Sequence, residues 1–225
     1  MPETVAFPAL VVLGAAFLVW FLAGNELMRR RARRLAVWSK RAVDPLGGKQ
    51  SVQWLTQQAF RLEVDRPSAP FKTATITGLV ESWDVPMVWL WNRLHGRRDM
   101  VVLNLSLREP PLWGFEVYRP GTILAGDARH FARQEGWAEE LLDEFTVAAP
   151  GDAPRQLASS LVQMLESDRE WLVRLALRRQ GAALTLAMNV ADPERLEPRR
   201  VAELVRRLAD HLSRWESFSQ PRRGG

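Results

Sequence analysis

The hydrophobic pattern of this chain begins with a run of twenty uncharged residues, 5–24. Twenty helical residues rise about 30 Å, which is the thickness of the hydrocarbon core of a bilayer. Five arginines follow closely: Arg29, Arg30, Arg31, Arg33 and Arg34. Because arginines beside a membrane span stay in the cytoplasm, residues 1–24 are predicted to be a single-pass plasma-membrane anchor with its N-terminus outside.

A cleaved secretory signal is the main alternative for this run. Signal peptides place positive charge before a shorter apolar stretch, whereas the only charged side chain before this run is Glu3. A buried core helix is the second alternative, and such helices seldom contain twenty uncharged residues in succession. The pattern therefore favours a retained anchor, with Trp20 near its inner boundary among the lipid headgroups.

Residues 26–42 contain no Pro or Gly and are predicted to continue the helix. Apolar side chains form a strip along it: Leu27, Met28, Leu35 and Trp38. Two interpretations stay open for this basic collar. It lies against an anionic leaflet, or its charges only set the topology. Gly47 and Gly48 then mark a hinge, so residues 25–50 are assigned to a juxtamembrane helix and hinge.

The pattern then changes to short stretches of alternating polar and apolar residues, which is typical of strands that bury one face. Strands are predicted at 60–65, 71–80, 100–107 and 113–119. Gly78 interrupts the second of these stretches, which indicates a bulge or the close approach of another group. Residues 51–126 are therefore expected to form a β-rich lobe.

Residues 84–95 carry a pattern that fits two structures. As a helix, the segment would end at Gly96. As a strand, it would pair with residues 100–107 through the turn at 95–98. The strand is favoured because two matched apolar runs around a glycine-containing turn are a strong signal for a hairpin.

As a strand, the same segment would place Met87, Trp89 and Trp91 on one side. Indoles usually fill a protein core, with their N–H groups paired. Both faces of this strand are apolar, however, so these three side chains are also a candidate surface for a partner, a lipid or an apolar ligand. Arg97 and Arg98 in the following turn are a candidate contact for a phosphate or headgroup, or belong to a solvated hairpin tip.

The second half of the chain, residues 127–219, mixes helix and strand patterns. Helices are predicted at 136–144, 154–166 and 198–215, and strands at 145–148, 171–178 and 182–190. The last helix has an apolar stripe that would close the core, and residues 220–225 are expected to be a flexible tail. The predicted fold class is thus α+β, with one transmembrane helix, a β-rich meander lobe and a small α+β lobe.

The net charge of +5 arises in residues 1–49, which contain eight Lys or Arg and three Asp or Glu. The rest of the chain has equal numbers of both signs. The folded part therefore lacks the net positive charge of a nucleic-acid-binding domain, and no nucleic-acid partner is expected. Cysteine is absent, which excludes disulfides, thiolate metal sites and cysteine nucleophiles.

Candidate catalytic side chains are few. Asp127, His130 and Glu135 lie close together in the sequence and would suit an acid–base pair or a metal ion. Side chains in such a polar stretch are more often solvated. Zinc motifs, a nucleophile elbow and a dinucleotide glycine pattern do not occur in the sequence, so no cofactor or metal is expected.

The order of the predicted elements resembles that of a group of bacterial membrane-anchored proteins of unknown activity. The resemblance spans residues 55–215 and depends on the Gly78 strand, residues 85–107, the run 110–117, and the strand and helix within 145–165. It implies an N-terminal hydrophobic helix, a β-meander and a small α+β unit with a closing helix. Because the group has no known activity, the resemblance implies no functional residue.

Two functions are therefore weighed for this chain. The first is a non-catalytic, membrane-tethered cytoplasmic domain that binds a partner protein or itself, since tethering raises its effective concentration for a membrane partner. The second is a membrane-associated hydrolase or transferase that uses Asp127, His130 and Glu135. Lipid recognition by the basic collar and by Arg97 and Arg98 is a third, minor alternative.

Overall fold

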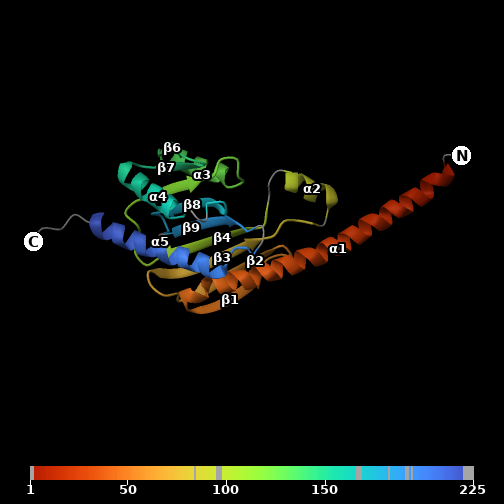
Figure 1. Ribbon diagram of the computed structural model, residues 1–225, viewed down its shortest axis with the longest axis horizontal. Helices are drawn as coiled ribbons and strands as arrows, with labels where there is room; N and C mark the ends of the chain where they lie inside the picture. Colours follow the sequence, from red (N-terminus) through yellow and green to blue (C-terminus); the bar gives the residue numbers. More distant parts are fainter. Residues whose placement is uncertain are drawn as a thin grey trace, which may run out of the picture.

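The computed structural model describes residues 3–83, 85–94, 98–165, 169–181, 183–190, 193 and 195–219, and for residues 3–6, 9 and 211–219 the backbone alone. The fold is α+β, with one long apolar N-terminal helix and one large antiparallel sheet (Figure 1). The helices are α1 (Glu3–Val43), α2 (Pro86–Leu94), α3 (Ala125–Gln134), α4 (Asp152–Met164) and α5 (Pro198–Ser219), and a short 3-10 helix, η1 (Asp44–Leu46), follows α1.

Nine strands form the sheet. They are β1 (Lys49–Trp54), β2 (Ala59–Asp65), β3 (Phe71–Leu79), β4 (Met100–Leu107), β5 (Phe115–Tyr118), β6 (Ala138–Leu142), β7 (Phe145–Ala149), β8 (Leu172–Arg178) and β9 (Ala183–Asn189). Their spatial order is β1-β2-β3-β4-β9-β8-β5-β7-β6. Strands from both predicted lobes belong to this one sheet, because β4 pairs with β9 and β5 pairs with β8.

One face of the sheet is covered by α1, α4 and α5, and these helices share a single hydrophobic core with the strands. Alternation along the strands determines which side chains enter that core: on β2, Phe60, Leu62 and Val64 are buried, whereas Arg61 and Glu63 between them are exposed. This period of two is what the sequence predicts for a strand with one wet face. Helix α5 lies beside α1 (Figure 1), which closes the core.

The opposite face is covered only in part. Helix α3 lies over β5, β6 and β7, and beneath it the fully buried carboxylate of Glu116 receives hydrogen bonds of 2.8–2.9 Å from the guanidinium groups of Arg174 and Arg178. The same face of β2, β3 and β4 carries polar side chains such as Thr75 and Asn104. A sheet with one covered face and one polar face is thereby formed.

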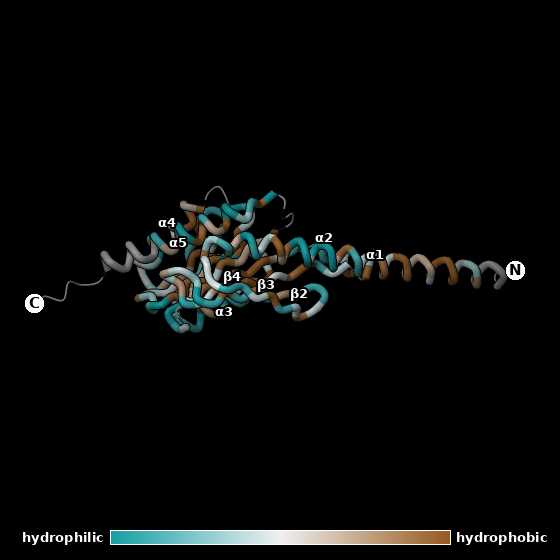
Figure 2. Tube along the Cα trace, turned by 90° about the horizontal axis from the view of Figure 1, so that it is seen from below, coloured by the Kyte–Doolittle hydropathy of each residue, from teal (hydrophilic) through white to brown (hydrophobic). Residues whose placement is uncertain are grey.

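Helix α1 joins the apolar segment to the sheet without a break. Its residues beyond position 27 enter the core: Met28, Ala32, Leu35, Trp38 and Val43 are buried. The indole of Trp38 donates a hydrogen bond of 2.7 Å to the carbonyl of Leu196, just before α5. The apolar half of α1 projects beyond the sheet (Figure 1), and Figure 2 shows it as a largely hydrophobic coil that becomes hydrophilic where it reaches the body.

The strand predicted at 84–95 is wrong. Residues 86–94 form helix α2, with Pro86 at its first position, where the missing N–H costs no helical hydrogen bond. A hairpin with residues 100–107 is also excluded by the sheet itself, because both edges of β4 are already paired, with β3 and with β9. The sequence shows two apolar runs, but it does not show that the second run, β4, has both edges already paired.

The helix predicted at 136–144 is wrong as well. Residues 138–142 are the edge strand β6, which turns into β7 at Asp143, a residue with a φ of 53°. The helix in this region is α3, which ends two residues before the predicted helix begins, and it faces the sheet with Ala125, Ala128 and Ala132. An alanine stripe is only weakly hydrophobic, so its period did not stand out.

Strand β1 was not predicted, since its residues Lys49–Trp54 follow the predicted hinge. The other predicted elements agree with the structure. The strands at 60–65, 71–80, 100–107, 113–119 and 145–148, the hairpin of β8 and β9, and the helices α4 and α5 lie within a few residues of their predicted positions. Gly78 is indeed a site of close approach, because a Cβ built on it would lie only 2.2 Å from the ring of Phe60 on β2. The tail at 220–225 lies outside the described residues.

Candidate functional site

The most unusual region of the molecule is the junction at which α1 leaves the sheet. The segment between β3 and α2 crosses α1 there, so closely that a Cβ built on Gly24 would lie 2.3 Å from the carbonyl oxygen of Trp83. A glycine at this position therefore permits backbone-to-backbone contact. The same crossing brings the amide of Trp83 to 3.2 Å from the sulfur of Met28.

Three tryptophans form the contact between α1 and α2. The indole N–H of Trp20 donates a hydrogen bond of 3.0 Å to the carbonyl of Trp83. The ring centroid of Trp89, on α2, lies 5.9 Å from that of Trp20 and 5.1 Å from that of Trp83. Tilted aromatic pairs at these distances are attractive beyond the area they bury. The cluster therefore holds α2 against α1.

A small charged network lies beside this aromatic cluster. Arg31 of α1 pairs with the carboxylate of Asp99 at 3.3 Å and stacks over the ring of Trp83, with 5.3 Å between its guanidinium carbon and the ring centroid. The other oxygen of Asp99 accepts a hydrogen bond of 2.8 Å from the backbone amide of Glu81. Thus α1 is linked to the ends of β3 and β4 by charge as well as by packing.

Burial in this network raises the pKa of two carboxyl groups. Desolvation raises the pKa of Glu81, and the neighbouring Asp99 raises it further, against the attraction of Arg93, Arg98 and Arg31. Desolvation also raises the pKa of Asp99, although the amide of Glu81 and the charge of Arg31 act in the other direction. One carboxylate oxygen of Glu81 is buried without a hydrogen-bond partner among the described residues, so its charged form is poorly stabilised.

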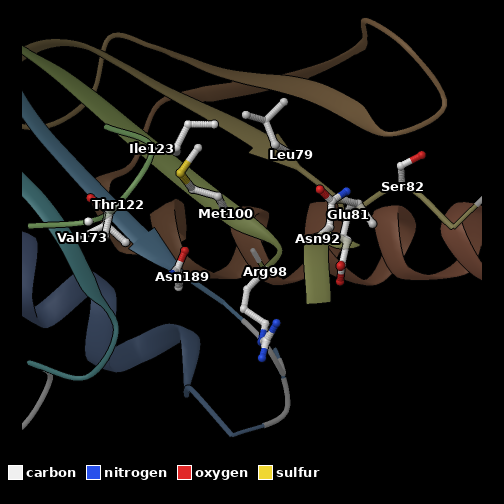
Figure 3. A pocket seen from close by; sticks show the side chains of 12 residues that line it. Leu79, Glu81, Ser82, Asn92, Arg98, Met100, Thr122, Ile123, Val173 and Asn189 are labelled. Atoms are coloured by element: carbon white, nitrogen blue, oxygen red, sulfur yellow. The ribbon is translucent and has the colours of Figure 1, made fainter. Parts of the chain in front are cut away.

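A cavity of about 540 Å³ opens beside Glu81 at the end of the uncovered sheet face. Its polar side chains include Glu81, Asn92 and Arg98 toward α2, and Asn189 at the end of β9. Figure 3 shows Leu79, Met100 and Ile123 grouped on another side of it. The cavity can hold a small molecule with both polar and apolar parts, but the described residues around it do not form a catalytic group.

The candidate partner surface is divided by the fold. Because α2 is a helix, Met87 and Trp91 lie on one side at i and i+4, and Trp89 points the other way, into the aromatic cluster. Met87 and Trp91 are largely exposed. The three residues therefore do not form one surface: Trp89 packs inside the protein, whereas the other two face outward.

The basic collar is also divided. Arg29, Arg30, Arg33 and Arg34 are exposed, and Arg30 forms an ion pair of 2.7 Å with Glu26, whereas Arg31 is held by Asp99. The apolar strip of the collar faces the protein, because Met28, Leu35 and Trp38 are buried and only Leu27 is exposed. This strip therefore packs on the sheet and is not open to a leaflet.

The catalytic candidates of α3 do not assemble into a site. Asp127 and His130 are exposed on α3, and Glu135 is exposed at its end. The structure shows no hydrogen bond or ion pair among these three side chains. Within the part of the chain that is described, no group of three or more His, Asp or Glu side chains could hold a metal ion. Arg97 lies outside the described residues.

No pattern in the sequence reveals the residues that build the junction. Gly24 ends the apolar run and could be noticed only as a small residue, since its role depends on the chain that crosses it. Glu81 and Asp99 flank the predicted strand at 84–95 on either side. Such positions suggest solvated loop residues. Their burial follows from α2 turning back on α1, which no local pattern reveals.

The comparisons with known proteins do not change this description. No family model matches the chain, and the curated proteins contain no match to it. The resemblance to bacterial membrane-anchored proteins therefore stays an expectation from the sequence.

The first prediction concerns the helix crossing. Gly24→Ala places a methyl group against the Trp83 carbonyl, so the junction must open, and the free energy of unfolding should fall by about 1–3 kcal/mol. The matched control is Gly14→Ala on the same helix, where a Cβ meets nothing within 4 Å, and it should cause no loss. Denaturant titration of the full chain in detergent micelles measures both. Equal stability of the two variants would contradict the crossing.

The second prediction concerns pH. A carboxyl group with a raised pKa binds its proton more readily in the folded than in the unfolded state, so stability falls as pH rises through that pKa. Because burial raises the pKa of Glu81, Glu81→Gln should be more stable than the native chain at neutral pH. This advantage should shrink as pH falls toward the ordinary carboxyl range. Denaturant titrations across pH measure this advantage, and Glu63→Gln, at an exposed position of β2, is the control. If the stability advantage of Glu81→Gln instead grew on acidification, the raised pKa of Glu81 would be refuted.

Proposed function

We propose that the protein is a single-pass membrane protein in which α1 serves as both the anchor and a core helix of a cytoplasmic, non-catalytic interaction or scaffold domain. The observation that carries this proposal is the division of α1 into two environments. Leu10, Val12, Leu18 and other apolar residues of its first half are exposed, whereas from Met28 onward most of its apolar residues, Val37 excepted, are buried against the sheet and α5. Of the described helices, α1 is the one that is long and apolar enough to cross a membrane.

Exposed apolar surface of this extent is costly in water, at roughly 25 cal/mol for each Å². The exposed part of α1 consists mainly of Val, Leu, Phe and Ala, and a bilayer would remove that cost while the helix satisfies its own backbone hydrogen bonds. A cleaved signal fits less well, since the same helix continues into the core and supplies buried residues such as Leu35 and Trp38.

The proposed orientation follows from the charge. Exposed arginines of the collar, such as Arg29 and Arg33, stand immediately after the apolar half of α1, and positive charge at a span favours the cytoplasmic side. The sheet is packed on the same end of the helix. In this orientation the whole folded domain lies on the cytoplasmic side.

An interaction role is favoured over catalysis by the surface that the domain leaves open. The uncovered face of β2, β3 and β4 is polar and is held in a fixed orientation by α1, with no flexible linker between span and sheet. Confinement near the membrane raises the effective concentration of such a face for a membrane-bound partner or for a second copy of the chain. The alternative site at Asp127, His130 and Glu135 has no feature of a built active site.

The third prediction tests the anchor and its orientation. The chain contains no cysteine, so single cysteines can be labelled without background. In intact cells, a membrane-impermeant maleimide should label Glu3→Cys, outside, and should not label Gln53→Cys on β1. After lysis, both should react.

Alkaline carbonate extraction of the same membranes provides the control for attachment. The full chain should stay in the membrane fraction. Labelling of Gln53→Cys in intact cells would reverse the proposed orientation, and release of the chain by carbonate would remove the anchor altogether.

A further inference from the structure

Helix α2 is apolar on the side that faces away from the protein. Its exposed positions include Met87, Trp91 and Leu94, which follow one another at i, i+4 and i+7, and Met87 and Leu94 are 71% and 74% exposed. A soluble domain usually turns such a stripe inward. Here the inward side is supplied by Trp89 and the buried Asn92, so the outer stripe is left for something else.

The position of α2 along α1 sets its depth relative to the proposed membrane. From Glu3 to Trp20, α1 rises about 26 Å, close to the roughly 30 Å of a hydrocarbon core. Trp20 therefore stands at the inner boundary of the bilayer if α1 spans it. Since the ring of Trp89 packs on Trp20, α2 is held at that boundary and cannot move into the cytoplasm without breaking the aromatic cluster.

Other exposed apolar side chains gather at the same end of the sheet. Strand register places the β1–β2 turn, the end of β3 and the start of β4 together, because Trp54 pairs with Phe60, Ala59 with Leu79, and Leu79 with Met100. Trp54, Leu55 and Leu79 there are between 40% and 49% exposed. Ile123, in the loop after β5, is also exposed and lines the same cavity as Leu79.

Basic side chains stand beside this apolar end. Arg29 and Arg30 follow the apolar half of α1, and Arg93 is exposed in the last turn of α2. An apolar stripe with flanking arginines is the pattern of a helix that lies in the interface of a membrane with anionic lipids. The end of the molecule at which α1 enters the bilayer thus has the chemistry of a lipid-facing surface.

We propose that α2 is an interfacial helix that inserts Met87, Trp91 and Leu94 into the cytoplasmic leaflet next to α1. The proposal rests on α1 being the membrane anchor. The domain then contacts the bilayer at two adjacent places, the span and α2, which the tryptophan cluster joins. Docking at both places fixes the tilt of the sheet relative to the membrane.

Lipid is favoured over a protein partner because α2 lies directly beside the apolar half of α1. Helix α2, which carries the exposed stripe, adjoins the apolar half of α1 through the Trp20–Trp89 contact on its inner side. A molecule that covers the stripe would therefore meet the surroundings of α1. A protein partner would have to enter the boundary region of the bilayer to reach Met87. Lipid is present there already.

The test uses the full chain in vesicles of phosphatidylcholine and phosphatidylglycerol. Single cysteines at Met87, Leu94, Val12 and Leu112 carry an environment-sensitive fluorophore, and a share of the lipid carries a nitroxide quencher on its acyl chain. Val12 reports on the span. Leu112, an exposed leucine at the opposite end of the sheet, is the matched control. Circular dichroism melting confirms that each labelled chain is folded.

The expected result is blue-shifted emission and loss of fluorescence with rising nitroxide lipid at Met87, Leu94 and Val12, and neither change at Leu112. Quenching at Val12 with water-like, unquenched emission at Met87 and Leu94 would overturn the docking of α2 and leave the anchor standing. Blue-shifted emission without quenching at Met87 would also overturn it, since a protein or a second copy would then cover α2. If Val12 is not quenched, the anchor itself fails, and the docking of α2 fails with it.

Discussion

One constraint organises this molecule: α1 is a single helix whose two halves need different surroundings. Its first half is apolar and exposed, and its second half supplies Leu35 and Trp38 to the core of the sheet. A helix can pass between two such environments because its backbone hydrogen bonds are internal in both. The change occurs between Trp20 and Met28, and it is stabilised by the crossing of the β3–α2 segment at Gly24, by the tryptophan cluster and by the pair of Arg31 with Asp99. The crossing fixes α2 and the charged network against α1.

The stability of the crossing involves opposing terms. Packing of Trp20, Trp83 and Trp89 is favourable, whereas burial of Glu81 and Asp99 is costly because their charged forms lose water. Arg31 compensates part of this cost, and it does so from α1, so the ion pair also specifies how α1 meets the strands. Because burial raises the pKa of both carboxyl groups, the stability of the crossing is expected to depend on pH. The Glu116 network under α3, by contrast, is fully paired within the sheet.

Much of the fold could be predicted from the sequence, and the failures have physical causes. The sequence predicts strands such as β2 and β4, and helix α5, because each buries one face. Burial of one face produces a periodic pattern of apolar residues. The prediction for residues 84–95 was wrong because both faces of α2 are apolar: one packs in the tryptophan cluster and the other is exposed. Neither the helical nor the strand period therefore stands out in the sequence. Residues 138–142 form an edge strand whose exposed, charged residues resemble the solvent-facing side of a surface helix, so a helix was predicted there. The junction was not predicted because the contacts of Gly24 with Trp83 and of Asp99 with Arg31 and Glu81 form only through long-range crossing of the chain.

The proposed arrangement requires α1 to run as one straight, unbroken helix from the bilayer into the core. The most direct measurement is the distance between spin labels at Val12→Cys and Val37→Cys, both exposed on α1, by pulsed electron paramagnetic resonance of the chain in lipid nanodiscs. An unbroken helix predicts a narrow distribution centred near 38 Å between the two Cα positions, from a rise of about 1.5 Å for each residue. A broad distribution, or one centred well below that value, would mean that the helix breaks near Gly24 and that the domain is only loosely tethered.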